Sequence, residues 1–213
     1  MRTEELIEAI ARDAAAPRPW LAGRMAAALL AGGAVAYALF ALDLGVRPDL
    51  LWAMLIDWRF PLKVTIAALS LAGACWAARR LARPETRARD VAIGLALAPL
   101  VLALGVGLEL VTLPADEWTT RAIGTNARVC LTSIPLLSLA PLATMLAAMR
   151  AGAPSSAPLA GAVAGLIAGG IGATLYATHC TDDSPLFVAL WYPLGIALVA
   201  LAGAVAGGRL LRW

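Results

Sequence analysis

Residue types that carry chemistry gather in one short segment, residues 178–192 (THCTDDSPLFVALWY). It contains His179, the only histidine of the chain, followed directly by Cys180 and then by Asp182, the first of two adjacent aspartates. Thiols form disulfides or bind thiophilic metals, imidazole is a metal ligand, and carboxylates add harder oxygen ligands. A second cysteine, Cys130, begins another apolar stretch. The segment is therefore a candidate for redox or metal chemistry.

Two kinds of site fit these side chains. Cys130 and Cys180 form a candidate thiol pair, in which the nearby Arg128 would favour the thiolate form of Cys130. The same two thiols, with His179 and Asp182, are candidate ligands for zinc or cadmium. Because no C-x-x-C spacing is present, we expect transient binding of a thiophilic metal and no resident cofactor.

Part of the segment is expected to be architectural. Asp183, Ser184 and Pro185 have the order that begins a helix, with Ser184 as the N-cap and Pro185 at the first helical position. We therefore expect Asp182 and Asp183 to serve mainly as loop and cap residues.

The composition indicates that membrane helices must position these residues. Of the 213 residues, 61% are hydrophobic and 15% are charged, whereas soluble domains have roughly half and a quarter. Each apolar stretch is long enough to cross a hydrocarbon layer of roughly 30 Å, and length favours helices over barrel strands. The sequence thus predicts an all-α, polytopic bundle of six transmembrane helices, at residues 25–42, 62–78, 91–113, 129–149, 159–177 and 186–207.

Basic residues predict the orientation of the bundle. The N-terminal tail, the second and fourth connections and the C-terminus carry four, five, one and two of the 17 Lys and Arg residues, which leaves five for the other side. The positive-inside rule then places both termini in the cytoplasm, and an even number of spans agrees. No cleavable signal peptide is expected, because no apolar core precedes residue 25. The positive-inside rule is enough to explain why Lys and Arg concentrate on the cytoplasmic side, so no direct contact with nucleic acid is predicted.

This orientation places Cys130 and Cys180 at the periplasmic ends of neighbouring spans, in an oxidising compartment. Helix axes pack roughly 8–10 Å apart, while a disulfide needs Cα atoms within about 7 Å. A disulfide between Cys130 and Cys180 would therefore require a small shift of the helices. Such a requirement suits a sensor better than a permanent structural disulfide. We expect Cys75, near the cytoplasmic end of its span, to be an ordinary buried side chain. Lys63 is expected to extend to the membrane interface.

Small residues in the fifth span favour close packing against another helix. Gly161, Gly165 and Gly169 recur every four residues, a spacing that lets two backbones approach each other.

The N-terminal arm, residues 1–20, is predicted to be a short amphipathic helix. Leu6, Ile7 and Ile10 share one face, and Pro17 and Pro19 follow it. Such a helix is marginal alone, so the apolar face needs the bilayer surface or a protein groove. Its acidic polar face would be repelled by anionic lipid. A protein partner is therefore the favoured interpretation, with residues 21–213 as the membrane domain.

Catalysis finds no support: neither a nucleophile–base spacing nor a phosphate-binding loop is visible, so we expect no enzyme. A small-molecule transporter is the main alternative, although no ionisable residue accompanies the helix-breaking prolines at mid-membrane. A scaffold protein, in which the cysteine state would not matter, is a third possibility.

The C-terminal half resembles a known family. The run from Cys130 (CLTSIPLLSLAPLATMLAAMRAGAP), the block YATHCTDDSPLFVALWY and the ending GGRLLRW look like the NrsF-type family of bacterial membrane anti-sigma factors. The resemblance covers essentially the whole chain and is strongest over residues 130–213.

The resemblance implies a six-span inner-membrane protein whose cytoplasmic N-terminus holds an extracytoplasmic-function (ECF) sigma factor of the sigma F type inactive. It also implies that Cys130 and Cys180 sense heavy-metal or oxidative stress. The choice of Leu6, Ile7 and Ile10 as sigma-factor contacts comes from periodicity alone.

Overall fold

The computed structural model describes residues 3–5, 8, 20–81, 88–151, 154 and 156–211. Its long helices are α2 (Trp20–Asp43), α4 (Arg59–Leu81), α5 (Ala88–Thr112), α7 (Ala127–Met149), α8 (Ala157–Ala177) and α9 (Pro185–Leu210). All six are long and apolar enough to cross a membrane. The predicted all-α, six-span architecture is confirmed, and within the described ranges the chain contains no strand.

Three short elements were not predicted from the sequence. They are α3 (Leu50–Ile56), the 3-10 turn η1 (Ala115–Glu117) and α6 (Trp118–Ile123). Trp52 and Leu55 of α3 expose 68% and 84% of their surfaces. An exposed Trp side chain at the end of a bundle is typical of a segment that lies in the membrane interface.

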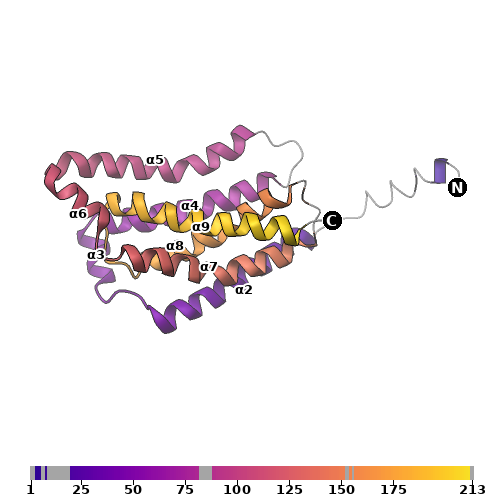
Figure 1. Ribbon diagram of the computed structural model, residues 1–213, viewed down its shortest axis with the longest axis horizontal. Helices are drawn as coiled ribbons and strands as arrows, with labels where there is room; N and C mark the ends of the chain where they lie inside the picture. The colour runs from indigo at the N-terminus through magenta and orange to yellow at the C-terminus, as the bar shows by residue number, and fades with distance from the viewer. Residues whose placement is uncertain are drawn as a thin grey trace.

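Helix α8 forms the centre of the bundle. It packs on α9, α7 and α4, whereas α5 leans on α4 and α9 along one edge and α2 packs on α7 along the opposite edge (Figure 1). A Cβ atom added at Gly165 of α8 would lie 2.5 Å from the Val199 carbonyl oxygen of α9. The packing role predicted for the small residues is therefore confirmed, since glycine lets these two backbones meet.

The bundle has two distinct ends. The connection between α8 and α9, residues 178–184, lies at the same end as α3 and α6, and the C-terminus lies at the opposite end (Figure 1). We call the former the loop end. His179, Cys180, Asp182 and Asp183 therefore all lie at the loop end.

Candidate functional site

Both candidate sensing cysteines lie at the loop end. Cys130 is in the first turn of α7, and Cys180 lies in the connection between α8 and α9. They belong to one buried cluster with Tyr176 and Tyr192. The structure therefore brings the two residues together, while Cys75 lies half-buried in α4. All three cysteines are free thiols.

The two thiols are closed off from the surroundings. Cys130 exposes 0% of its surface and Cys180 exposes 1%. Burial raises the pKa of the Cys180 thiol, although the positive charge of Lys63 opposes this shift. A raised pKa keeps the neutral thiol, which is a poor nucleophile and metal ligand. In this conformation Cys180 is therefore protected as the neutral thiol.

A buried cation holds the connection that carries Cys180. The Lys63 ammonium donates to the Cys180 carbonyl oxygen at 2.6 Å and forms an ion pair with the Asp183 carboxylate. Arg47 donates to the other oxygen of Asp183 at 2.8 Å and also pairs with Asp49. Lys63 exposes only 1% of its surface. The prediction that Lys63 extends to the membrane interface is therefore wrong, because Asp183 gives it a buried counter-ion.

The pairing with Arg47 affects the charge of the exposed partner as well. The hydrogen bonds from the Arg47 guanidinium lower the pKa of Asp49, and the same contacts raise the pKa of Arg47. Both groups are thus held in their charged forms at neutral pH.

Asp182 and His179 hold the connection from two further directions. One carboxylate oxygen of Asp182 accepts hydrogen bonds from the backbone amides of Thr125 and Asn126, at 2.9 and 2.7 Å. The His179 Nδ1 atom lies 3.0 Å from the Gly45 carbonyl oxygen. We call Arg47, Lys63, His179, Asp182 and Asp183 the polar cap.

These contacts turn the proposed metal ligands in different directions. Across the described residues, no group of three or more His, Cys, Asp or Glu side chains lies in an arrangement that could hold a metal ion. The structure thus joins Cys130 and Cys180 in one cluster, but does not gather His179 and Asp182 with them as a ligand set. Transient capture of a thiophilic metal would need the connection to rearrange.

A second buried charge ties α5 to the start of α9. Glu109 exposes 0% of its surface and accepts hydrogen bonds from Arg59 at 2.8 Å and from the Ser184 hydroxyl at 2.6 Å. Ser184 in turn caps α9 by accepting from the Leu186 amide at 3.2 Å, and Pro185 is the first helical residue. The predicted helix start is confirmed.

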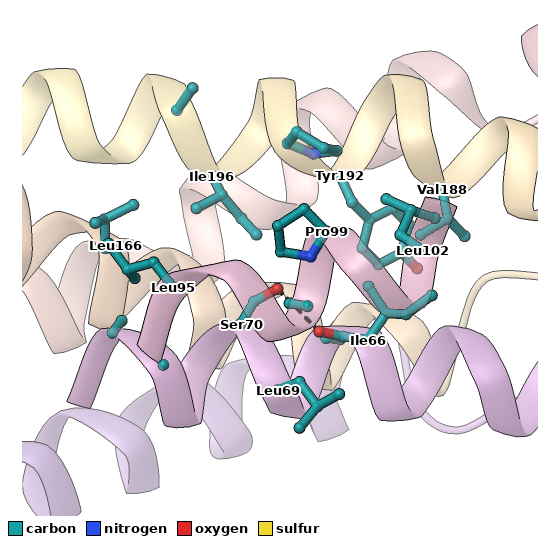
Figure 2. Close-up of a pocket in the computed structure, with 16 residues that line it drawn as sticks. Ile66, Leu69, Ser70, Leu95, Pro99, Leu102, Leu166, Val188, Tyr192 and Ile196 are labelled. Carbon is teal, nitrogen blue, oxygen red and sulfur yellow. Dashed lines mark hydrogen bonds between the residues drawn. The ribbon is translucent and has the colours of Figure 1, made fainter. Parts of the chain in front are cut away.

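An apolar pocket lies beside the thiol cluster, between α4, α5 and α9. Its volume is about 270 Å³. Figure 2 shows Pro99 in its middle and Tyr192 at one end, beside Val188 and Leu102. Tyr192 belongs to the same buried cluster as the two cysteines, and its ring lies 6.1 Å from that of Tyr176, so the pocket borders the thiol cluster.

Tyr192 also carries a polar group without a counterpart. Its hydroxyl is buried and makes no hydrogen bond among the described residues. Such groups cost free energy in a folded protein.

The ion pairs of Lys63 and Glu109 were not predicted, although two signals in the sequence indicate that both residues need partners. Lys63 is the only lysine of the chain and stands inside an apolar segment, and Glu109 is the only acid in its own span. Charges in such positions require partners. Asp183 and Arg59 are at the same predicted end, but only the three-dimensional arrangement identifies them as those partners.

Comparisons with known proteins agree with the family resemblance. Residues 10–213 match the family model described as NrsF, negative regulator of sigma F. The chain is 34% identical over 214 residues to the probable anti-sigma-F factor NrsF of Azospira oryzae, and 37% identical over 216 residues to the anti-sigma-F factor NrsF of Caulobacter vibrioides. Both matches cover 100% of each chain. No solved structure gives a significant match. The chain therefore belongs to the NrsF family of negative regulators of sigma F, a family of regulatory proteins.

Proposed function

We propose that the chain is a membrane-bound anti-sigma factor, with an ECF sigma factor of the sigma F type as its partner. The observation that carries this proposal is the match, over the full length of both chains, to two relatives named as anti-sigma-F factors. The composition and the six apolar helices support a place in the bacterial inner membrane. The distribution of Lys and Arg supports cytoplasmic termini.

In the resting state the cytoplasmic arm, residues 1–20, holds the sigma factor away from RNA polymerase. Its predicted contacts, Leu6, Ile7 and Ile10, lie outside the described residues. The neighbouring residues 3–5 are helical and exposed, as is residue 8. An amphipathic helix that docks its apolar face into a groove is a common mode of recognition.

Cys130 and Cys180 serve as the sensing residues. A hydroperoxide would oxidise one thiol to a sulfenic acid with release of water or an alcohol. The second thiol would then attack that sulfur, forming the disulfide and releasing one molecule of water. A thiophilic metal ion would instead bind both sulfurs and displace their protons. The burial of both thiols in one cluster supports a change of packing during either reaction.

The signal must then cross the bilayer as a change between two arrangements of the helices. Shifting a population from 1:99 to 99:1 requires about 5.5 kcal/mol of differential stabilisation. A disulfide or metal–thiolate bonds present in only one arrangement can supply an energy of this size. Cys130 begins α7 and Cys180 follows α8, and these two helices pack on each other, so theirs is the packing that would change.

Co-purification from membranes tests the sigma-factor part of the proposal. The full chain and a Leu6→Asp variant are each expressed with the sigma factor, and a Leu6→Met variant serves as the matched control. We expect the wild-type and Leu6→Met chains to retain the sigma factor and Leu6→Asp to lose it. Equal retention by all three chains would rule out the apolar face of the arm as the binding surface.

A further inference from the structure

Any reagent that reacts with Cys130 or Cys180 must first reach sulfurs that the fold covers. Both residues expose 1% of their surface or less. Cys180 belongs to the connection at residues 178–184, which folds over the loop end of the bundle. The connection must therefore move before the thiols can react, and its attachments decide how readily it moves.

Most attachments of the connection are shared with short loops. Asp182 bonds to Thr125 and Asn126 before α7, and His179 bonds to Gly45 after α2. Loops can follow a moving segment at low cost.

Two attachments reach long helices: Ser184 donates to Glu109 of α5 at 2.6 Å, and Lys63 of α4 holds the part of the connection that carries Cys180. Lys63 lies in the second turn of α4 and reaches the Cys180 carbonyl oxygen at 2.6 Å and the Asp182 carbonyl oxygen at 3.4 Å. It also pairs with the Asp183 carboxylate. One ammonium thus contacts three acceptors of the connection, and one of them belongs to the proposed sensing residue Cys180. Because α4 packs on α8 and α5, it cannot move as easily as a loop.

We propose that Lys63 is a positioning residue that keeps the connection closed over the thiols and thereby sets their accessibility, an inference that rests on the proposed sensing role of Cys180. Opening separates the ammonium from the Cys180 carbonyl and from Asp183. The same event frees the loop end of α4, so exposure of the thiols and movement of a membrane helix occur together.

The pairing pattern makes Lys63→Met an informative change. Asp183 keeps its bond to Arg47 at 2.8 Å in this variant, so no lone charge is buried. The connection loses only its link to α4. A Lys63→Arg variant keeps the charge and the donors, and Arg121→Met removes an exposed ion pair with Glu117 that does not touch the connection.

The test measures alkylation of the full-length, detergent-solubilised chain by a maleimide, with each cysteine followed separately by mass spectrometry. For Lys63→Met we expect the rate at Cys180 to rise about tenfold or more, as expected for a lower cost of local opening. Arg121→Met should leave the rate unchanged, and Lys63→Arg should restore protection in large part. Half-buried Cys75 reports loosening of the whole bundle and should react equally in all variants.

An unchanged or slower rate at Cys180 in Lys63→Met would overturn the inference, and so would a rise of the same size at Cys75. If Lys63→Met does not fold, Lys63→Gln provides the second variant, which removes the ion pair with Asp183 and leaves no unpaired buried charge, and the rate at Cys180 should rise in it as well. The measurement reads thiol access and not sigma-factor release. Its failure would leave the proposed function standing, whereas a normal stress response without the cysteines would remove their sensing role whatever the labelling rates.

Discussion

The ammonium of Lys63 donates a hydrogen bond to the backbone carbonyl oxygen of Cys180, with 2.6 Å between nitrogen and oxygen. The chain's only lysine therefore lies directly on a residue that the family resemblance implicates in sensing. A helix predicted to cross the membrane and a connection predicted to face the periplasm are joined at this point.

Asp183 should be the most sensitive member of the polar cap. It pairs with both Lys63 and Arg47, so Asp183→Ala leaves the buried Lys63 without a counter-ion, while Arg47 keeps only its pair with Asp49. We expect a loss of about 3–5 kcal/mol in the free energy of unfolding, as for other broken buried pairs. Titration of the detergent-solubilised chain with a denaturing detergent measures it. The control Glu117→Gln breaks an exposed pair with Arg121 and should cost at most about 0.5 kcal/mol. Equal losses would contradict the description of the cap as buried.

Gly165 should tolerate no larger side chain. A Cβ atom there would meet the Val199 carbonyl oxygen of α9 at 2.5 Å, whereas a Cβ at Gly33 of α2 has no neighbour within 4 Å. Overpacking costs about 1–3 kcal/mol, so Gly165→Val should lower the thermal unfolding temperature while Gly33→Val leaves it nearly unchanged. A comparable loss from both variants would mean that valine disturbs helices in general and that α8 and α9 do not meet at Gly165.

Removing the Tyr192 hydroxyl should stabilise the protein. This hydroxyl is buried without a hydrogen-bond partner in the described part of the chain. Deleting such a group can raise the free energy of unfolding by about 1 kcal/mol. Tyr192→Phe should therefore raise the free energy of unfolding. The matched variant Tyr176→Phe removes a hydroxyl that bonds to the Asn126 carbonyl at 3.5 Å and should bring no gain. A clear loss from Tyr192→Phe would show that its hydroxyl has an important partner.

The six spans and the start of α9 could be predicted from the sequence because each depends on local information. Apolar length predicts a span, and the order of Ser184 and Pro185 predicts the helix start. The Gly161, Gly165 and Gly169 spacing likewise predicted a packed face, which the contacts with α9 confirm.

The position of Lys63 could not be predicted in this way. An isolated lysine near the end of a span is expected to extend its ammonium to the membrane interface. The lysine stays buried instead when a carboxylate from a distant part of the chain pairs with it. Asp183 lies 120 residues further along the chain, and nothing local connects the two. The short helices α3 and α6 were missed for a related reason: segments of seven and six residues are too short to show a span or a reliable period.

The reactivity of Cys180 should depend on pH in a direction set by its surroundings. Burial raises the pKa of this thiol, and alkylation proceeds through the thiolate. The rate at Cys180 in the folded chain should therefore rise at higher pH than the rate at the same residue in the denatured chain, whose midpoint should lie near the ordinary value of about 8.5. Alkylation rates measured by mass spectrometry across a pH series give both midpoints. A folded midpoint at or below the denatured one would contradict the protected environment.

The central claim, that Cys130 and Cys180 control release of the sigma factor, is tested most directly by a sigma-factor-dependent reporter in intact cells. Cells carrying the wild-type chain, Cys130→Ser, Cys180→Ser or the control Cys75→Ser are exposed to cadmium or to a hydroperoxide, and reporter transcription is followed. The account predicts induction with the wild-type and Cys75→Ser chains, and a reporter that no longer responds with Cys130→Ser or Cys180→Ser at equal membrane abundance. Normal induction in both of these variants would contradict it.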